Sequence, residues 1–155
     1  MITRTLAAGA AILLTATGAS AQDVRMFVPE GQESIVERFR MAPAIRAGDY
    51  VFISGVVGYI VPGEERTEDA YEAAIRDTFE RVETVLNEAG TGWSDVVEMT
   101  SFHVDMREHQ EIFRSVREEF ITTEPYPAWT AIGVDKLWVD ALFLEIRVVA
   151  YVGER

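Results

Sequence analysis

The stretch from Ala141 to Val152 constrains the fold most, because it suits a strand that is packed on both faces. Successive side chains of a strand point to opposite faces. Alternate residues here form one wholly apolar face: Leu142, Leu144, Ile146, Val148, Ala150 and Val152. The other face is mixed and holds Phe143, Glu145, Arg147, Val149 and Tyr151. A face open to water is mostly polar, so we expect helices on the apolar face and another subunit on the mixed one.

A long helix is predicted after Thr67, which suits an N-cap because its hydroxyl can accept a bond from a free backbone N–H. Gly90 suits the C-terminal end, where a left-handed residue is common. Apolar residues recur between them at helical spacing: Tyr71, Ile75, Phe79, Val82 and Leu86. This stripe predicts the helix that covers the sheet.

Shorter patterns predict the other elements. Gly48-Asp49 suits a hairpin turn, and Gly55 suits a bulge or a close approach of a ligand to the backbone. We expect a second helix over residues 107–120 and further strands over 24–28, 35–41, 96–104 and 128–134. The order predicts one α+β domain over residues 22–155, a two-layer sandwich with two helices on one face of a mixed sheet.

The first 21 residues are predicted to be a secretory signal peptide. Arg4 gives a positive start, residues 6–17 are apolar, and Ala19-Ser20-Ala21 forms a cleavage pattern. The apolar segment is shorter than the roughly 20 residues that span a bilayer; an uncleaved anchor is the alternative. We therefore expect cleavage after Ala21, a periplasmic or secreted protein, and no membrane association afterwards.

The charge balance and the rare residues narrow the partners. The chain has 14 Lys+Arg against 26 Asp+Glu, a formal net charge of -12, which repels nucleic acid and anionic membranes. It has no cysteine and two histidines, His103 and His109, so we expect no disulfide, no thiol chemistry and no metal site. A small-molecule ligand and other copies of the chain are the expected partners.

Five segments, in order and spacing, resemble the RidA/YjgF family: residues 44–55, 78–90, 93–97, 127–131 and 145–150. The resemblance implies a chorismate-mutase-like fold and a homotrimer with sheets inside, helices outside and a cleft at each subunit boundary. It also implies hydrolysis of reactive enamines or imines to keto acids and ammonia, without a metal or organic cofactor.

The site that the resemblance implies is only partly present. Active members carry a carboxylate-binding arginine directly after Pro-Ala, where this chain has Trp129. Their aromatic hydroxyl falls near Met41, and an asparagine falls near Phe113. Ser54 matches the family's pocket serine, and Glu145 matches the acid that is thought to hold the attacking water.

Each candidate residue has two interpretations. Glu145 orients water or binds a cationic group, or else forms a salt bridge with Arg147. Arg147 replaces the missing carboxylate grip, or is a structural ion pair. Trp129 stacks on a planar ligand, or fills the cleft. Ser54 lines the pocket, or only bonds the backbone.

His103 is expected to be a packing residue rather than a general base. Two functions follow: a diverged imine or enamine hydrolase in which Glu145 is catalytic, or a non-catalytic small-molecule-binding trimer. Ser54, Trp129 and Arg147 are the predicted ligand-binding residues in both.

Overall fold

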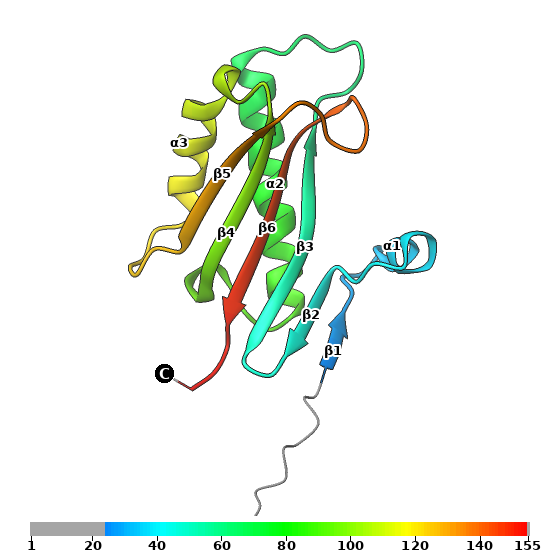
Figure 1. Ribbon diagram of the computed structural model, residues 1–155, viewed down its shortest axis with the longest axis vertical. Helices are drawn as coiled ribbons and strands as arrows, with labels where there is room; N and C mark the ends of the chain where they lie inside the picture. The colour runs from blue at the N-terminus through cyan, green and yellow to red at the C-terminus, as the bar shows by residue number, and fades with distance from the viewer. Residues whose placement is uncertain (1–23, 155) are drawn as a thin grey trace, which may run out of the picture.

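In the computed structural model, which describes residues 24–154, a six-stranded sheet carries two long helices on one face (Figure 1). The strands are β1 (Val24–Phe27), β2 (Ala44–Ala47), β3 (Tyr50–Tyr59), β4 (Val96–Val104), β5 (Ala128–Val134) and β6 (Leu142–Tyr151). The helices are α1 (Glu33–Phe39), α2 (Glu68–Glu88) and α3 (Gln110–Phe120), with 3₁₀ turns at Trp93–Asp95 and Met106–Glu108.

The predicted signal peptide, residues 1–21, lies outside the described residues. Within residues 24–154, no helix is long and apolar enough to cross a membrane.

The sheet is mixed, as predicted. Its order is β1-β2-β3-β6-β4-β5, and all neighbours are antiparallel except β4 and β5. The parallel pair needs a crossover, which α3 provides. The two-layer α+β architecture expected from the order of elements is confirmed. Strand β1 lies at the edge, as its short alternating pattern predicted.

Strand β6 lies between β3 and β4, and its predicted apolar face is buried. Leu144, Ile146, Val148 and Ala150 have no exposed surface. Phe143 was assigned to the mixed face, and that assignment is wrong. The register shifts between Gly58 and Tyr59, which pair with Leu144 and Leu142. Phe143 lies between these two pairs without a paired residue on β3, and its side chain is buried against the helix layer.

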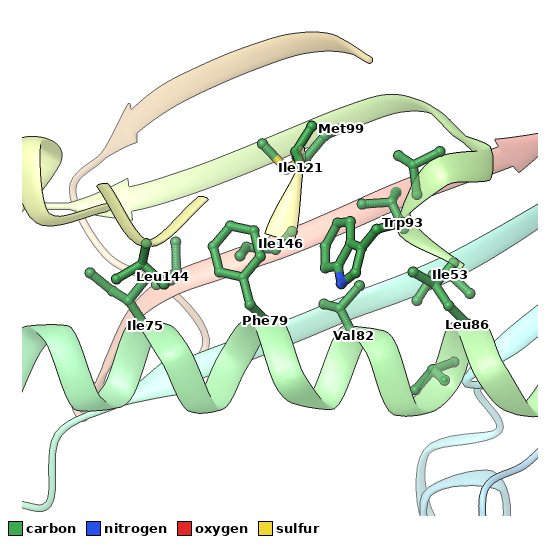
Figure 2. Close-up of a cluster of buried hydrophobic side chains, with 14 of the residues drawn as sticks. Ile53, Ile75, Phe79, Val82, Leu86, Trp93, Met99, Ile121, Leu144 and Ile146 are labelled. Carbon is green, nitrogen blue, oxygen red and sulfur yellow. The ribbon is translucent and has the colours of Figure 1, made fainter. Parts of the chain in front are cut away.

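Helix α2 packs its apolar stripe on the sheet. Thr67 accepts a hydrogen bond from the Ala70 backbone N–H (3.2 Å), and Gly90 follows the helix with a φ of 75°. Figure 2 shows the α2 side chains of Ile75, Phe79, Val82 and Leu86 pointing at the strands. All five predicted stripe residues are buried. Phe79 lies at the centre and meets the rings of Trp93, Phe113 and Phe120.

One predicted strand and one predicted helix boundary are wrong. Residues 35–41 were expected to form a strand, but most of them belong to α1, which ends at Arg40 in a left-handed conformation. Ile35 and Phe39 are one helical turn apart and line a common hollow beside β3. Tertiary packing therefore outweighs the preference of the β-branched residues Ile35 and Val36 for a strand. The second helix was expected from residue 107; it begins at Gln110, because Met106–Glu108 forms a 3₁₀ turn.

The sheet face opposite the helices carries exposed apolar side chains. Tyr50 and Phe52 on β3 are 45% and 43% exposed, and Ile132 on β5 is 37% exposed. Arg147 and the half-buried Glu145 lie on the same face. The open face of the sheet is thus mixed and partly apolar from β3 to β5, as the sequence predicted for this face of β6. That another subunit covers this face stays a prediction.

We expect Phe79→Ala to lower the free energy of unfolding by about 3–5 kcal/mol, because it removes the ring at the centre of the aromatic cluster and leaves a cavity. Urea denaturation measures the change. Phe39→Ala is the matched control, since Phe39 is 55% exposed and should cost less than about 1 kcal/mol. Equal losses in the two variants would contradict this account of the core.

Candidate functional site

The carboxylate of Glu145 lies against Gly55. Strand β3 bulges between Ile53 and Val56, opposite β6, so the predicted irregularity at Gly55 is confirmed. A Cβ atom on Gly55 would overlap the Glu145 carboxylate. Glycine therefore permits the close approach of this acid to the β3 backbone, and the bulge holds Glu145 half-buried at the open face of the sheet.

Glu145 has no ion pair in the described part of the chain, and neither does Arg147. The salt bridge that the sequence allowed between them is not formed in this structure. Across the strands, Glu145 pairs with Phe102 and Arg147 with Thr100. A carboxylate that is half-buried and not neutralised is able to accept a hydrogen bond from water or from a ligand.

Ser54 combines both interpretations that the sequence left open. Its hydroxyl donates to the carbonyl oxygen of Ala42 (2.7 Å), which is a backbone bond. It also lines a hollow of ≈ 420 Å³ between α1, α2 and β3. Met41, near which the family's aromatic hydroxyl falls, lines the same hollow. Because Ser54 donates its proton to Ala42, its oxygen remains an acceptor for a ligand.

Trp129 lies at the opposite end of the sheet, on β5, and faces the helices. Its indole Nε1–H donates to Ser101 Oγ (3.0 Å), and its ring stacks on Phe113 with centroids 5.7 Å apart. The Arg117 guanidinium lies 4.1 Å from the ring centroid. The side chain is still 36% exposed. Trp129 is therefore held in one orientation with part of its ring open to solvent.

Behind Trp129 is a buried polar chain that the sequence analysis did not identify. His103 Nε2 lies 2.8 Å from Ser101 Oγ, and His103 Nδ1 lies 3.1 Å from His109 Nε2. The indole can only donate, so Ser101 Oγ accepts from Trp129. The donor in the Ser101–His103 and His103–His109 contacts depends on the tautomers of the two rings. His109 Nδ1 is buried with no partner among the described residues.

Both imidazoles are neutral. Burial is the main cause that lowers the pKa of each imidazole to about 4, and repulsion from His109 contributes to the lowered pKa of His103. His109 also stacks on Tyr71, with centroids 5.0 Å apart. His103 is thus the packing residue that the sequence predicted. The alternation that places Ser101 and His103 on one face of β4 was the sequence signal for this hydrogen-bonded group. No sequence signal indicated that the turn after β4 would bring His109 next to His103.

One chain does not bring the predicted site residues together. Glu145 and Arg147 are on the open face of β6, while Trp129 is on the helix face of β5 with β4 between them. Ser54 is on β3, beside another hollow. A site that uses both Glu145 and Trp129 therefore needs a second copy. Residues 24–154 contain no group of three or more His, Cys, Asp or Glu side chains that could hold a metal ion.

Residues 33–152 match the protein family described as Endoribonuclease L-PSP. The RutC family protein YjgH of Escherichia coli strain K12 is 35% identical over 127 residues, covering 82% of this chain and 94% of that protein. The RutC family protein PH0854 of Pyrococcus horikoshii is 30% identical over 112 residues, covering 70% and 83%.

Solved structures agree with these matches. The structure of protein YJGH superposes with a TM-score of 0.69 at 33% identity, covering 84% of this chain and 98% of that chain. RidA from the Antarctic bacterium Psychrobacter sp. PAMC 21119 superposes with a TM-score of 0.60 at 27% identity, covering 72% and 88%.

We expect Gly55→Ala to destabilise the fold by about 1–3 kcal/mol, because the new methyl group must displace the Glu145 carboxylate. Glu145→Ala in the same chain should restore most of the loss, which a double-mutant cycle of urea denaturation curves measures. Gly92→Ala is the control: nothing lies within 4 Å of its Cβ position. A Gly55→Ala loss that is unchanged by Glu145→Ala would refute the contact.

The buried histidines predict a loss of stability in mild acid. Their pKa values are lowered on folding, so the unfolded chain binds more protons between pH 6.5 and pH 4, and the free energy of unfolding falls as the pH falls through this window. Each histidine contributes at most about 3 kcal/mol. His109→Gln keeps a hydrogen-bond acceptor but not the titration, and should flatten the slope. Parallel slopes in thermal melts of both proteins would contradict this.

Proposed function

This chain belongs to the RidA/YjgF family, and on that premise we propose that it binds a small imine or enamine in a cleft between subunits and hydrolyses it to a carbonyl compound and ammonia. The proposal needs no cofactor. Family membership supports the small-molecule site, and the position of Glu145 supports the reaction.

The observation that carries the proposal is the position of Glu145. Its carboxylate lies at the Gly55 bulge, half-buried and without an ion pair among residues 24–154. Such a carboxylate accepts a hydrogen bond from water and orients its oxygen toward the imine carbon. An enamine first tautomerises to the imine, gaining a proton at carbon and losing one from nitrogen. Water then adds across the C=N bond, and loss of ammonia from the adduct leaves the carbonyl group. Ser54 would accept a hydrogen bond from the substrate nitrogen.

A homotrimer would supply the missing half of the site. Glu145 and Trp129 lie on opposite faces of one sheet, so a cleft lined by both is formed only between copies. The exposed Tyr50, Phe52 and Ile132 give the open face the apolar surface that a subunit interface needs. The arrangement implied by the family, with sheets inside and helices outside, places this face at the trimer axis. Arg147 would then be near the cleft as well.

Export to the periplasm or medium is part of the proposal. It rests on the signal-peptide pattern that ends at Ala21. In that compartment the protein would act on a reactive intermediate outside the cytoplasm. The acidic surface supports a small molecule and other copies of the chain as partners, rather than nucleic acid.

The second candidate function is binding without catalysis. Trp129 stands where active relatives carry the carboxylate-binding arginine, and its ring is held by Ser101, Phe113 and Arg117 with part of it exposed. A fixed, part-exposed indole suits stacking on a planar ligand. In this case Glu145 would contact the ligand rather than a water molecule.

The test is the conversion of 2-aminoacrylate, generated in situ, to pyruvate. We expect the protein to accelerate the appearance of pyruvate above the buffer rate and Glu145→Gln to lower the acceleration at least about tenfold, a change of roughly 1.4 kcal/mol in the barrier. Glu80→Gln, on the exposed side of α2, should leave it unchanged. Light scattering should show three copies. No acceleration by the wild-type protein would refute hydrolysis of this substrate and leave the binding candidate.

A further inference from the structure

Arg117 is half-buried, and its side chain has no acidic partner among the described residues. Arg76, Arg81 and Arg114 each pair with at least one carboxylate on the helix surface. The side chain of Arg117, on α3, has no ion pair or hydrogen bond in the described structure, and its Nε is buried without a partner. Burial lowers the pKa of the Arg117 guanidinium. A charge that is partly removed from water without an acidic partner is costly, so we expect a compensating contact.

One compensating contact is the face of Trp129, 4.1 Å from the guanidinium carbon. Arginine commonly stacks on tryptophan in this way. A guanidinium that packs through its face keeps the donors of its edge directed away from the ring. These are the donors that bind a carboxylate in bidentate fashion. The Nε donor is buried, so the terminal Nη1 and Nη2 donors, which have no partner among the described residues, are the ones that can reach an anion.

Trp129 is a rigid support for this cation. The indole Nε1–H is committed to Ser101, which is tied to His103 and through it to His109. Each of these three partners is buried. These hydrogen bonds fix the plane of the indole ring, and the ring in turn limits where the Arg117 guanidinium lies. A preorganised cation loses less entropy when it binds an anion.

A hollow of ≈ 520 Å³ adjoins Arg117 and is lined also by Glu118, Ile121, Thr122 and Tyr126. Thr122 and Tyr126 add hydroxyl groups that can donate to an anion. Glu118 would repel one, but it pairs with Arg114 at 3.5 Å. The hollow is large enough for a small organic acid and has one unpaired cation at its wall.

We infer that Arg117, supported by Trp129, is the carboxylate-binding residue of this chain, and that its ligand is a small 2-oxo or 2-imino acid. Trp129 occupies the β5 position at which active family members carry the arginine. Arg117 of α3 places a cation next to that position. This inference deepens the proposed function, on which it rests for the class of ligand. It contrasts with the sequence-based assignment of the grip to Arg147, which lies on the other face of the sheet.

The test is a titration with pyruvate, followed by the indole N–H signal of Trp129 in ¹⁵N-labelled protein. Trp129→Phe assigns that signal. We expect a saturable shift with pyruvate and at least about tenfold weaker binding of its neutral methyl ester, since a charge-assisted pair contributes about 1.5–3 kcal/mol. Arg117→Gln should weaken pyruvate binding to a similar extent, with Arg117→Lys between the two.

Arg107→Gln, at an exposed arginine in the 3₁₀ turn before α3, is the matched control and should bind pyruvate like the wild-type protein. Equal affinity for pyruvate and its ester, wild-type affinity in Arg117→Gln, a loss confined to Arg147→Gln, or no saturable shift would each overturn the inference. Binding without turnover of 2-aminoacrylate would refute the proposed hydrolysis alone. Turnover that is unaffected by Arg117→Gln would refute the Arg117 assignment alone.

Discussion

The structure depends on the burial of β6 between β3 and β4. Its hydrogen bonds are satisfied on both sides, and Leu144, Ile146 and Val148 are fully buried on the helix side. This central position carries Glu145 to the β3 bulge, where Gly55 makes room for a carboxylate. The same constraint that builds the core thus places the candidate acid at the open face, where a ligand or second subunit can reach it.

At the β5 edge, the Trp129 ring contacts the Arg117 guanidinium from the neighbouring helix. The indole also needs an acceptor, which Ser101 supplies. Such a buried polar chain favours one arrangement of the core only if its members are paired. Trp129 is therefore one member of a connected set of contacts that includes Ser101 and Arg117.

The two halves of the candidate site lie far apart in the fold. Ser54 and Glu145 belong to the β3–β6 side, whereas Trp129 and Arg117 belong to the β5–α3 edge. Repeating the chain around an axis would bring unlike edges together, and the apolar open face gives a physical reason for such assembly. A site that used residues of both groups would therefore require more than one copy of the chain.

The sequence alone determined the two-faced strand β6, the α2 stripe with its caps and the mixed sheet, because alternation and helical spacing report which side of an element is buried. It also located Gly55 as a break in β3. Only the tertiary structure decided that Phe143 turns inward, that residues 35–39 are helical, and that His109 meets His103. The contact between Arg117 and Trp129 was likewise decided only by the tertiary structure. These contacts depend on register shifts and on crossovers between elements, which a periodic pattern within one element does not encode.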